Sequence, residues 1–169
     1  FGGKLTDCLN VGEEVVGEVR ELGIAVPDCD AIWYGEPRGS VRERFMAQAR
    51  QLGLDGMTDP GSSEPLSERF WRRYGEAAFQ LLDRIREDPT SVELLIEHAE
   101  YTRCEIELTA RREMVVRLED FMRRRSKIEQ VLRRDVIARA PGLREASRIL
   151  FGEAGDERLA RYLGDGGES

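Results

Sequence analysis

The first residues of the chain carry the pattern best suited to holding an anion. Gly2 and Gly3 precede Lys4, Leu5 and Thr6, and an amphipathic stretch follows them. A glycine pair lets the backbone approach a ligand closely, and the start of a helix presents free N–H groups to negative charge. Lys4 adds a positive charge at the same place. The pattern predicts a binding turn, and by itself it specifies no reaction.

A run of three arginines, Arg123 to Arg125, is the most basic stretch of the chain. On a helix, successive side chains point about 100° apart, so the three do not form one patch. Glu119 and Asp120 each lie four residues before an arginine, Arg123 and Arg124 respectively. Acid before base at this spacing stabilises a helix by a few tenths of a kcal/mol per pair. We predict two structural ion pairs, and a phosphate or partner site is the alternative interpretation.

The segment from residue 104 to 115 is apolar on two faces if it is helical. One face carries Ile106, Ala110 and Met114, and the other carries Cys104, Leu108 and Val115. This pattern is typical of a helix at the centre of a bundle. Glu107 and Arg111 lie between the two faces, and we predict an ion pair between them, either structural or part of a domain interface.

Residues with the usual catalytic side chains are sparse and scattered. His98 is the only histidine and is expected at the surface or at an interface. Cys8, Cys29 and Cys104 are odd in number, far apart and without a CxxC pair, which predicts reduced thiols in a cytosolic protein and no metal site. Because no Ser/His/Asp or Cys/His arrangement can be assembled, we predict no catalytic residue in this chain.

The elements that must position these residues are helices. Hydrophobic residues make up 40% of the 169 residues and aromatic residues only 7%, which favours an all-α fold of about five to six helices over a β-sandwich. The formal charge of −7 argues against a nucleic-acid-binding protein. No apolar run approaches the roughly 18 residues that a membrane span requires.

Composition divides the chain into three parts. Residues 1–25 form one unit, in which Val15, Val16 and Val19 recur at helical spacing before Gly23 ends the helix. Residues 26–65 are rich in Pro, Gly, Asp and Ser and are predicted to be a linker with one short helix near 41–52. Residues 66–169 are predicted to form the helical domain.

Within the helical part, several boundaries can be placed. An apolar stripe from Phe70 to Ile85 stops before Pro89. Thr90 and Glu93 have the spacing of a capping box that would open the next helix. That helix could run to about Ile128, with breaks expected at 101–102 or 115–116. No internal repeat is evident in the sequence.

Two widely separated groups of residues resemble one protein family. The opening "FGGKLT" resembles the last strand-to-helix junction of the FAD domain in FAD-dependent glycerol-3-phosphate dehydrogenases. The helical C-terminal domain of that family is similar to "RRYGEAAFQLL" (72–82), to "ILFGEAGDERLARYL" near the end, and to a set of motif positions between them. These positions are Glu105-Ile106, Glu113-Met114, Leu118-Glu119-Asp120 and Arg124-Arg125-Ser126.

The resemblance implies that the chain is a C-terminal fragment of an alpha-glycerophosphate oxidase-like flavoenzyme. Residues 1–25 would be the strand and helix that end the FAD-binding domain. In this family FAD accepts hydride from C2 of sn-glycerol 3-phosphate, dihydroxyacetone phosphate is formed, and the electrons pass to a quinone or to oxygen. Gly2, Gly3, Lys4, Leu5 and Thr6 would lie against the flavin, with Lys4 near the flavin or the substrate phosphate.

The same resemblance implies the partners of the fragment. These are the FAD and substrate domains of its own chain, with a homodimer as a further expectation and no nucleic acid. The location would be cytoplasmic, with contact to a membrane surface as an open alternative. The fragment itself would be structural, inactive and unable to hold FAD tightly. The sequence departs from the family pattern at Asp7-Cys8-Leu9 and at Arg117, and the alternative function is a non-enzymatic helical interaction module.

Overall fold

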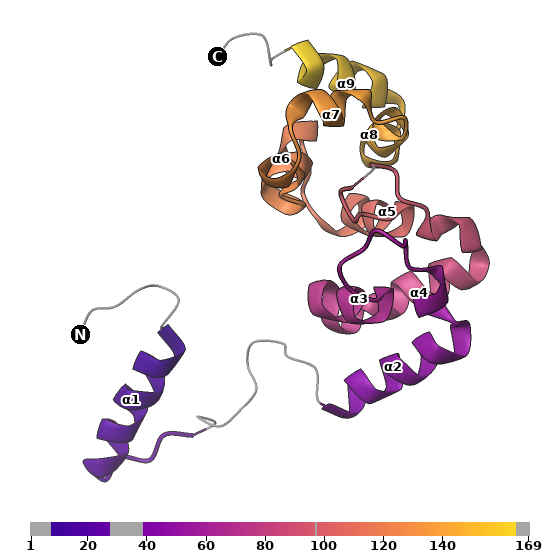
Figure 1. Ribbon diagram of the computed structural model, residues 1–169. Helices are drawn as coiled ribbons and strands as arrows, with labels where there is room; N and C mark the ends of the chain where they lie inside the picture. The colour runs from indigo at the N-terminus through magenta and orange to yellow at the C-terminus, as the bar shows by residue number, and fades with distance from the viewer. Residues whose placement is uncertain (1–7, 28–38, 97, 165–169) are drawn as a thin grey trace. The chain divides into compact units, whose positions relative to one another are not determined.

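The computed structural model describes residues 8–27, 39–96 and 98–164 of the chain. It divides into two compact units, residues 1–36 and residues 37–169, which are described separately. Every element in the described residues is a helix, and the only β-type pairing among them is an isolated antiparallel bridge between Leu94 and Thr102. The predicted all-α fold is therefore confirmed (Figure 1). The predicted strand remnant falls in residues 1–7, outside the described residues.

The first unit contains one described helix, α1 (Cys8–Glu21). It ends where predicted, because Gly23 adopts a positive φ of 78° and its N–H donates to the carbonyl of Arg20. Val15 is exposed, whereas Val16 and Val19 are half-buried. Of these three valines, only Val15 is thus exposed, with 40% of its surface accessible.

The second unit begins with α2 (Gly39–Leu52), followed by the 3₁₀ turn η2 (Leu54–Met57). After a loop come α3 (Leu66–Tyr74), the 3₁₀ turn η3 (Gly75–Ala77) and α4 (Ala78–Glu87). The predicted short helix is confirmed as α2, but it does not belong to a linker. Phe45 of α2 and Leu54 of η2 are fully buried in one cluster with Phe70. The helical unit therefore starts well before residue 66, because the Pro- and Ser-rich stretch is a loop inside it.

The central part of the unit contains the 3₁₀ turn η4 (Pro89–Val92) and the helix α5 (Arg103–Arg112). The predicted capping box at Thr90 is wrong, since Asp88 caps this turn by accepting a hydrogen bond from the N–H of Thr90 at 3.0 Å. The capping box forms instead between Thr102 and Glu105, at the start of α5. Both breaks expected in the long helical stretch are present, one on each side of α5.

The last part is divided into more pieces than predicted. It contains the π-helix η5 (Asp120–Arg125), α6 (Ile128–Val131), α7 (Arg134–Arg139), α8 (Leu143–Phe151), the 3₁₀ turn η6 (Gly152–Ala154) and α9 (Gly155–Gly164). The described residues of the second unit thus hold eight α-helices, against the five to six expected. The additional breaks follow from local backbone conformation. Lys127 has a φ of 59°, and Arg133 and Ala140 are extended.

Two parts of this unit repeat the same structure, which corrects the expectation that the chain has no repeat. α3, η3 and α4 have 9, 3 and 10 residues, and α8, η6 and α9 have the same lengths in the same order. The turn glycines also match, with φ and ψ of 52° and −127° at Gly75 and 58° and −128° at Gly152. We refer to residues 39–87, which end in the first of these units, as the first repeat and to residues 118–164, which end in the second, as the second repeat. The earlier parts of the two ranges differ, with α2 and η2 in the first and η5, α6 and α7 in the second.

The repeats share only a few side chains, which explains why the sequence conceals them. An aromatic residue, Gly, Glu, Ala and a small residue occur at each turn, as "YGEAA" and "FGEAG". Both repeats also contain a buried phenylalanine followed by methionine, Phe45-Met46 and Phe121-Met122. Most other positions differ in residue type.

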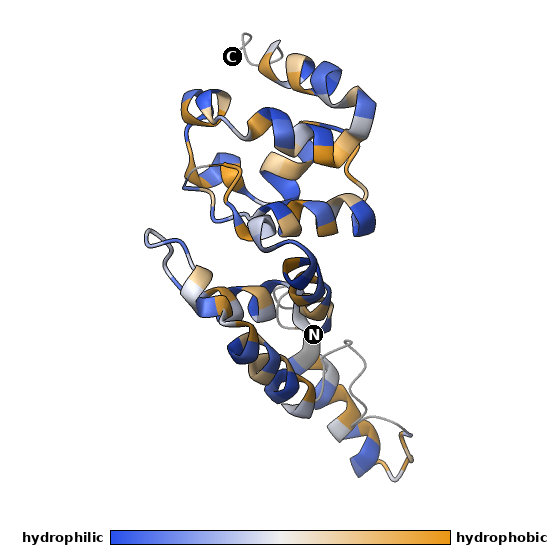
Figure 2. Ribbon diagram, turned by 90° about the vertical axis from the view of Figure 1, so that its right-hand side faces the viewer, coloured by the Kyte–Doolittle hydropathy of each residue, from blue (hydrophilic) through white to orange (hydrophobic). Residues whose placement is uncertain are grey.

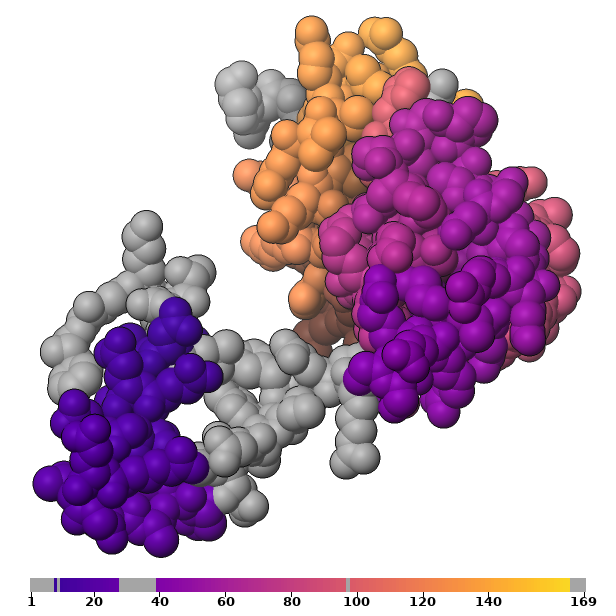
Figure 3. Space-filling view, turned by 60° about the horizontal axis from the view of Figure 1, so that its bottom comes forward, coloured from indigo at the N-terminus to yellow at the C-terminus, as the bar shows by residue number. Residues whose placement is uncertain are grey.

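Each repeat has its own hydrophobic core, and α5 joins the two. Cys104 and Leu108 enter the cluster of the first repeat, while Ile106 enters the cluster of the second. The prediction that this helix is central and apolar on two faces is therefore confirmed. In Figure 1, α5 lies between the group α2–α4 and the group α6–α9. Apolar stripes of the helices appear in orange in Figure 2, and the two repeats adjoin in magenta and orange in Figure 3.

Candidate functional site

The residues predicted to contact a flavin, Gly2 to Thr6 and with them Lys4, lie outside the described residues. The described part of the chain offers a different site, which is a buried charged centre beside a large cleft. Both lie in the second unit, the charged centre between α3 and α5 and the cleft between the loop 56–63 and the second repeat. Neither contains a group of three His, Cys, Asp or Glu residues arranged to hold a metal ion within the described residues.

Glu105 is the middle of the charged centre. Its side chain is fully buried in the first turn of α5. The capping box fixes it there, because Glu105 Oε2 accepts hydrogen bonds from the N–H and the hydroxyl of Thr102, both at 2.9 Å. Oε2 thereby caps the first turn of α5, and Oε1 faces α3.

Two arginines of α3 surround this carboxylate. Arg73 donates to Glu105 Oε1 at 2.8 Å, and Arg69 lies 3.6 Å from Oε2. The hydroxyl of Tyr74 donates to Oε1 at 3.1 Å. Arg69 and Arg73 reach the same group because residues four apart share one face of a helix. Two cations thus accompany a single buried anion.

The excess positive charge is distributed over neighbouring acceptors. Arg73 also donates to the carbonyl of Glu100 at 2.8 Å and lies over the ring of Tyr101, 4.3 Å from its centroid. Arg69 is only 1% exposed and donates to the hydroxyl of Ser62 at 3.3 Å, while its Nε has no partner among the described residues. The centre therefore connects α3, α5 and the loop that carries Ser62.

Three side chains of the centre, those of Cys104, Tyr74 and Arg73, have pKa values shifted upward from their usual ranges. Burial raises the pKa of the Cys104 thiol to about 12, despite the hydrogen bond to Thr102, so no thiolate nucleophile is available. Burial and the charge of Glu105 both raise the pKa of the Tyr74 phenol. Burial lowers the pKa of the Arg73 guanidinium, but Glu105 outweighs it and the net change is upward. None of these three groups is poised as a general acid or base near pH 7.

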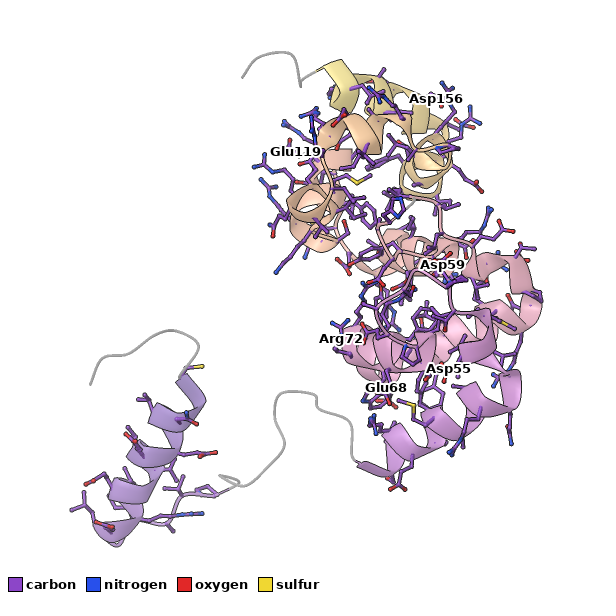
Figure 4. All side chains as sticks on the ribbon, in the orientation of Figure 1. Asp55, Asp59, Glu68, Arg72, Glu119 and Asp156 are labelled. Carbon is purple, nitrogen blue, oxygen red and sulfur yellow. The ribbon has the colours of Figure 1, made fainter. Side chains whose placement is uncertain are left out.

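The cleft runs along one side of this centre and has a volume of about 1190 Å³. Its walls come from the loop 56–63, from residues 92–95 and 98–100, and from parts of the second repeat around Ser126, Val131 and Gly142. Asp59 belongs to this wall, and in Figure 4 it lies at the height of α5, between the two groups of helices. His98 is exposed on the same wall, in agreement with its expected surface position.

No prediction from the sequence named Arg69, Arg73, Tyr74 or Thr102, and these four residues complete the charged centre. A signal for them exists, because Arg69 and Arg73 lie four residues apart beside the buried Phe70. The Thr-x-x-Glu spacing of Thr102 and Glu105 is a second signal. Neither indicates that the two segments meet, since the contact joins residues more than thirty positions apart.

Two of the three predicted ion pairs are confirmed. Arg123 donates to Glu119 at 2.7 Å and Arg124 donates to Asp120 at 2.5 Å. Figure 4 shows Glu119 on the second repeat. Asp120 has a further role, because its carboxylate accepts from the N–H of Arg117 at 2.9 Å and so caps the segment for which the sequence offers no N-cap.

The predicted pair between Glu107 and Arg111 is wrong. Glu107 instead accepts two hydrogen bonds from Arg84 of α4, at 2.6 and 3.1 Å. Arg111 lies on the exposed end of α5. The packing of α4 against α5 supplies a closer cation than the one on the same helix. The hydrogen bond from Arg84 to Glu107 raises the pKa of the guanidinium.

A flavin dinucleotide does not fit the described residues. The side chains that line the cleft include Asp59, Glu93 and Glu100 and no arginine or lysine, so they would repel a pyrophosphate.

None of the helices in residues 8–27, 39–96 and 98–164 combines the length and apolarity needed to cross a bilayer.

Comparison with known proteins places the chain in a family. A family model, the C-terminal domain of alpha-glycerophosphate oxidase, matches residues 39–146. The match begins at the first residue of α2 and ends within α8. No curated protein and no solved structure matches the chain. Because the matched residues make up more than half of the sequence, the chain belongs to the family of the C-terminal domain of alpha-glycerophosphate oxidase.

Proposed function

We propose that this chain is the helical C-terminal part of an FAD-dependent oxidoreductase that oxidises sn-glycerol 3-phosphate to dihydroxyacetone phosphate. The observation that carries the proposal is the family match over residues 39–146. The "FGGKLT" opening supports it independently, since it lies outside the matched residues and resembles the flavin junction of the same enzymes.

The proposed role of the helical part is structural. Among its described residues, Arg69 and Glu105 are the only strongly buried charged side chains. They pair with each other, and Glu105 also forms the capping box. The Cys104 thiol is protonated at neutral pH because burial raises its pKa to about 12. These features support a rigid domain that packs on the FAD and substrate domains of the parent chain. FAD would supply hydride acceptance there, with a quinone or oxygen as the final acceptor.

We further propose that Gly2 to Thr6 contact the flavin in the parent enzyme. Glycines at positions 2 and 3 would let the backbone approach the ring, and Lys4 would offset negative charge on the reduced flavin or on the substrate phosphate. This placement follows from the resemblance, and the described residues begin after it.

The test uses the full-length protein, obtained by extending the reading frame upstream of Phe1. The purified protein is expected to show flavin absorbance that sn-glycerol 3-phosphate bleaches without oxygen present. The matched control is the enantiomer, sn-glycerol 1-phosphate, which presents the same charge and size and should leave the flavin oxidised. Bound flavin that neither compound bleaches would contradict the substrate. Absence of any flavin would contradict the enzyme and favour a non-enzymatic helical interaction module.

A further inference from the structure

The cleft beside the charged centre has a composition that selects for positive charge. Its described lining contains the carboxylates of Asp59, Glu93 and Glu100 and no basic side chain other than His98. Apolar side chains lie among them, above all Val131, which is 78% exposed. At about 1190 Å³ the cleft exceeds the roughly 300–1,000 Å³ typical of small-molecule pockets. It is therefore suited to a cationic and partly apolar peptide segment.

The walls of the cleft are formed in advance. Glu100 accepts from the N–H of Ser63 at 2.8 Å, and its own carbonyl is held by Arg73 of the buried centre. His98 and Glu100 keep positive φ values of 62° and 52°, which non-glycine residues adopt only when their surroundings impose it. At Gly142 a Cβ would lie 2.0 Å from the carbonyl oxygen of Leu95, so only glycine permits this wall to close.

A segment of matching chemistry lies elsewhere on the same chain. We call residues 111–117, which are the end of α5 and the loop after it, the basic loop. Arg111, Arg112 and Arg117 are exposed on it and form no salt bridge with a described residue. Two large apolar side chains stand among these arginines, Met114 with 82% and Val116 with 54% of its surface exposed. Exposed apolar side chains beside unpaired arginines are typical of protein interfaces.

The basic loop is also held in one shape. Asp120 accepts from the N–H groups of Val116 and Arg117 at 3.3 and 2.9 Å. Glu113 forms an ion pair with Arg125 at 3.3 Å. A loop fixed in this way loses little conformational entropy when it binds.

We propose that the basic loop of one copy binds in the cleft of a second copy. Three arginines on the loop match the three carboxylates of the cleft, and Met114 and Val116 match the exposed Val131. Of these carboxylates, Glu93 also pairs with Arg103 at 3.4 Å and Glu100 also accepts from Ser63, while Asp59 forms no salt bridge with a described residue. In this structure Met114 is 82% exposed, so the loop does not occupy the cleft of its own copy. The proposal concerns assembly only and does not depend on the flavin reaction.

The experiment compares four forms of the 169-residue chain by sedimentation velocity, over concentrations up to roughly 100 μM. The loop variant is Arg112→Glu/Arg117→Glu and the cleft variant is Asp59→Lys/Glu93→Lys. The control is Arg50→Glu/Arg139→Glu, which makes the same change of charge at exposed arginines away from both surfaces. All six positions are exposed, and circular dichroism would verify that each variant is folded.

The unchanged chain is expected to self-associate, and more weakly as salt is added. The loop and cleft variants should each raise the dissociation constant at least about tenfold, and the control less than about twofold. An equal mixture of the loop and cleft variants should associate again, because the exchanged charges attract.

Three results would overturn the proposal. A chain that stays monomeric throughout the concentration series has no such interface. Association that survives both variants must use another surface, such as the exposed residues of α1. If both variants abolish association and their mixture does not restore it, the loop and the cleft do not meet each other.

Discussion

At the scale of single residues, the balance of charge around Glu105 decides how the helical unit is held together. Arg69 and Glu105 are almost completely buried, and Arg73 is 18% exposed. Removing one partner from such a group leaves the other charges in a medium that solvates them poorly. The exposed ion pairs of the chain lack this feature, since water replaces a lost partner.

We predict that Glu105→Gln lowers the free energy of unfolding by about 3–5 kcal/mol. The amide keeps the size of the side chain and can still accept from Thr102, but it cannot balance Arg69 and Arg73. Urea denaturation followed by circular dichroism would measure the change.

The matched control for this substitution is Glu119→Gln. Glu119 forms a good hydrogen bond with Arg123, yet both side chains are about half exposed. Its removal should change stability by less than about 1 kcal/mol. Equal effects of the two substitutions would mean that burial does not determine the contribution of Glu105.

The same contrast explains which residues could be predicted from the sequence. The pairs of Glu119 and Asp120 are local, since the partners lie one helical turn apart, and the further contact of Arg123 with Glu129 at 3.5 Å does not displace Glu119. Glu107 also has an arginine one turn away, but Arg84 of α4 reaches it first. Spacing along one helix cannot reveal a competing partner on another helix.

At the scale of elements, the turns between helices are the most closely matched parts of the two repeats. Gly75 and Gly152 both have a φ above +50° with a ψ near −130°, a combination that is essentially restricted to glycine. Each lets the chain reverse from one helix into a short 3₁₀ turn and then into the next helix. The sequence Gly-Glu-Ala, which starts at each of these glycines, is the same in both repeats.

We predict that Gly152→Ala lowers the free energy of unfolding by about 1–3 kcal/mol. A Cβ at Gly152 would meet no atom within 4 Å, so the cost would come from the backbone conformation alone. The control is Gly56→Ala, where a Cβ also meets nothing within 4 Å and φ is not positive. Thermal unfolding of both variants would show whether only Gly152→Ala is destabilised. A neutral Gly152→Ala would mean that this turn has another conformation.

At the scale of the whole molecule, the sequence predicted the class of fold better than its organisation. The two apolar faces of α5 are visible in the sequence, because Ile106 and Leu108 fall on opposite sides of one helix. The duplication is not, because residue types at matching core positions differ, as with Ile85 and Tyr162. The extent of the helical unit was also underestimated, since the Pro- and Ser-rich loop 58–65 has the composition of a linker and is nevertheless held by Arg69 and Glu100.

The shared helix has a consequence for unfolding, which two single-tryptophan variants can measure. In Trp33→Phe, Trp71 reports on the core of the first repeat, where it lies 5.4 Å from the ring of Phe45. In Trp33→Phe/Trp71→Phe/Phe151→Trp, the new indole reports on the core of the second repeat, against which Phe151 packs.

Because α5 contributes side chains to both cores, neither core can lose its packing without exposing part of the other. We therefore predict that the two reporters give the same denaturation midpoint within error, as a single cooperative unit requires. Two separate midpoints would mean that each repeat folds by itself and that α5 belongs to only one of them. A shared midpoint that Glu105→Gln splits into two would instead identify the charged centre as the link between the repeats.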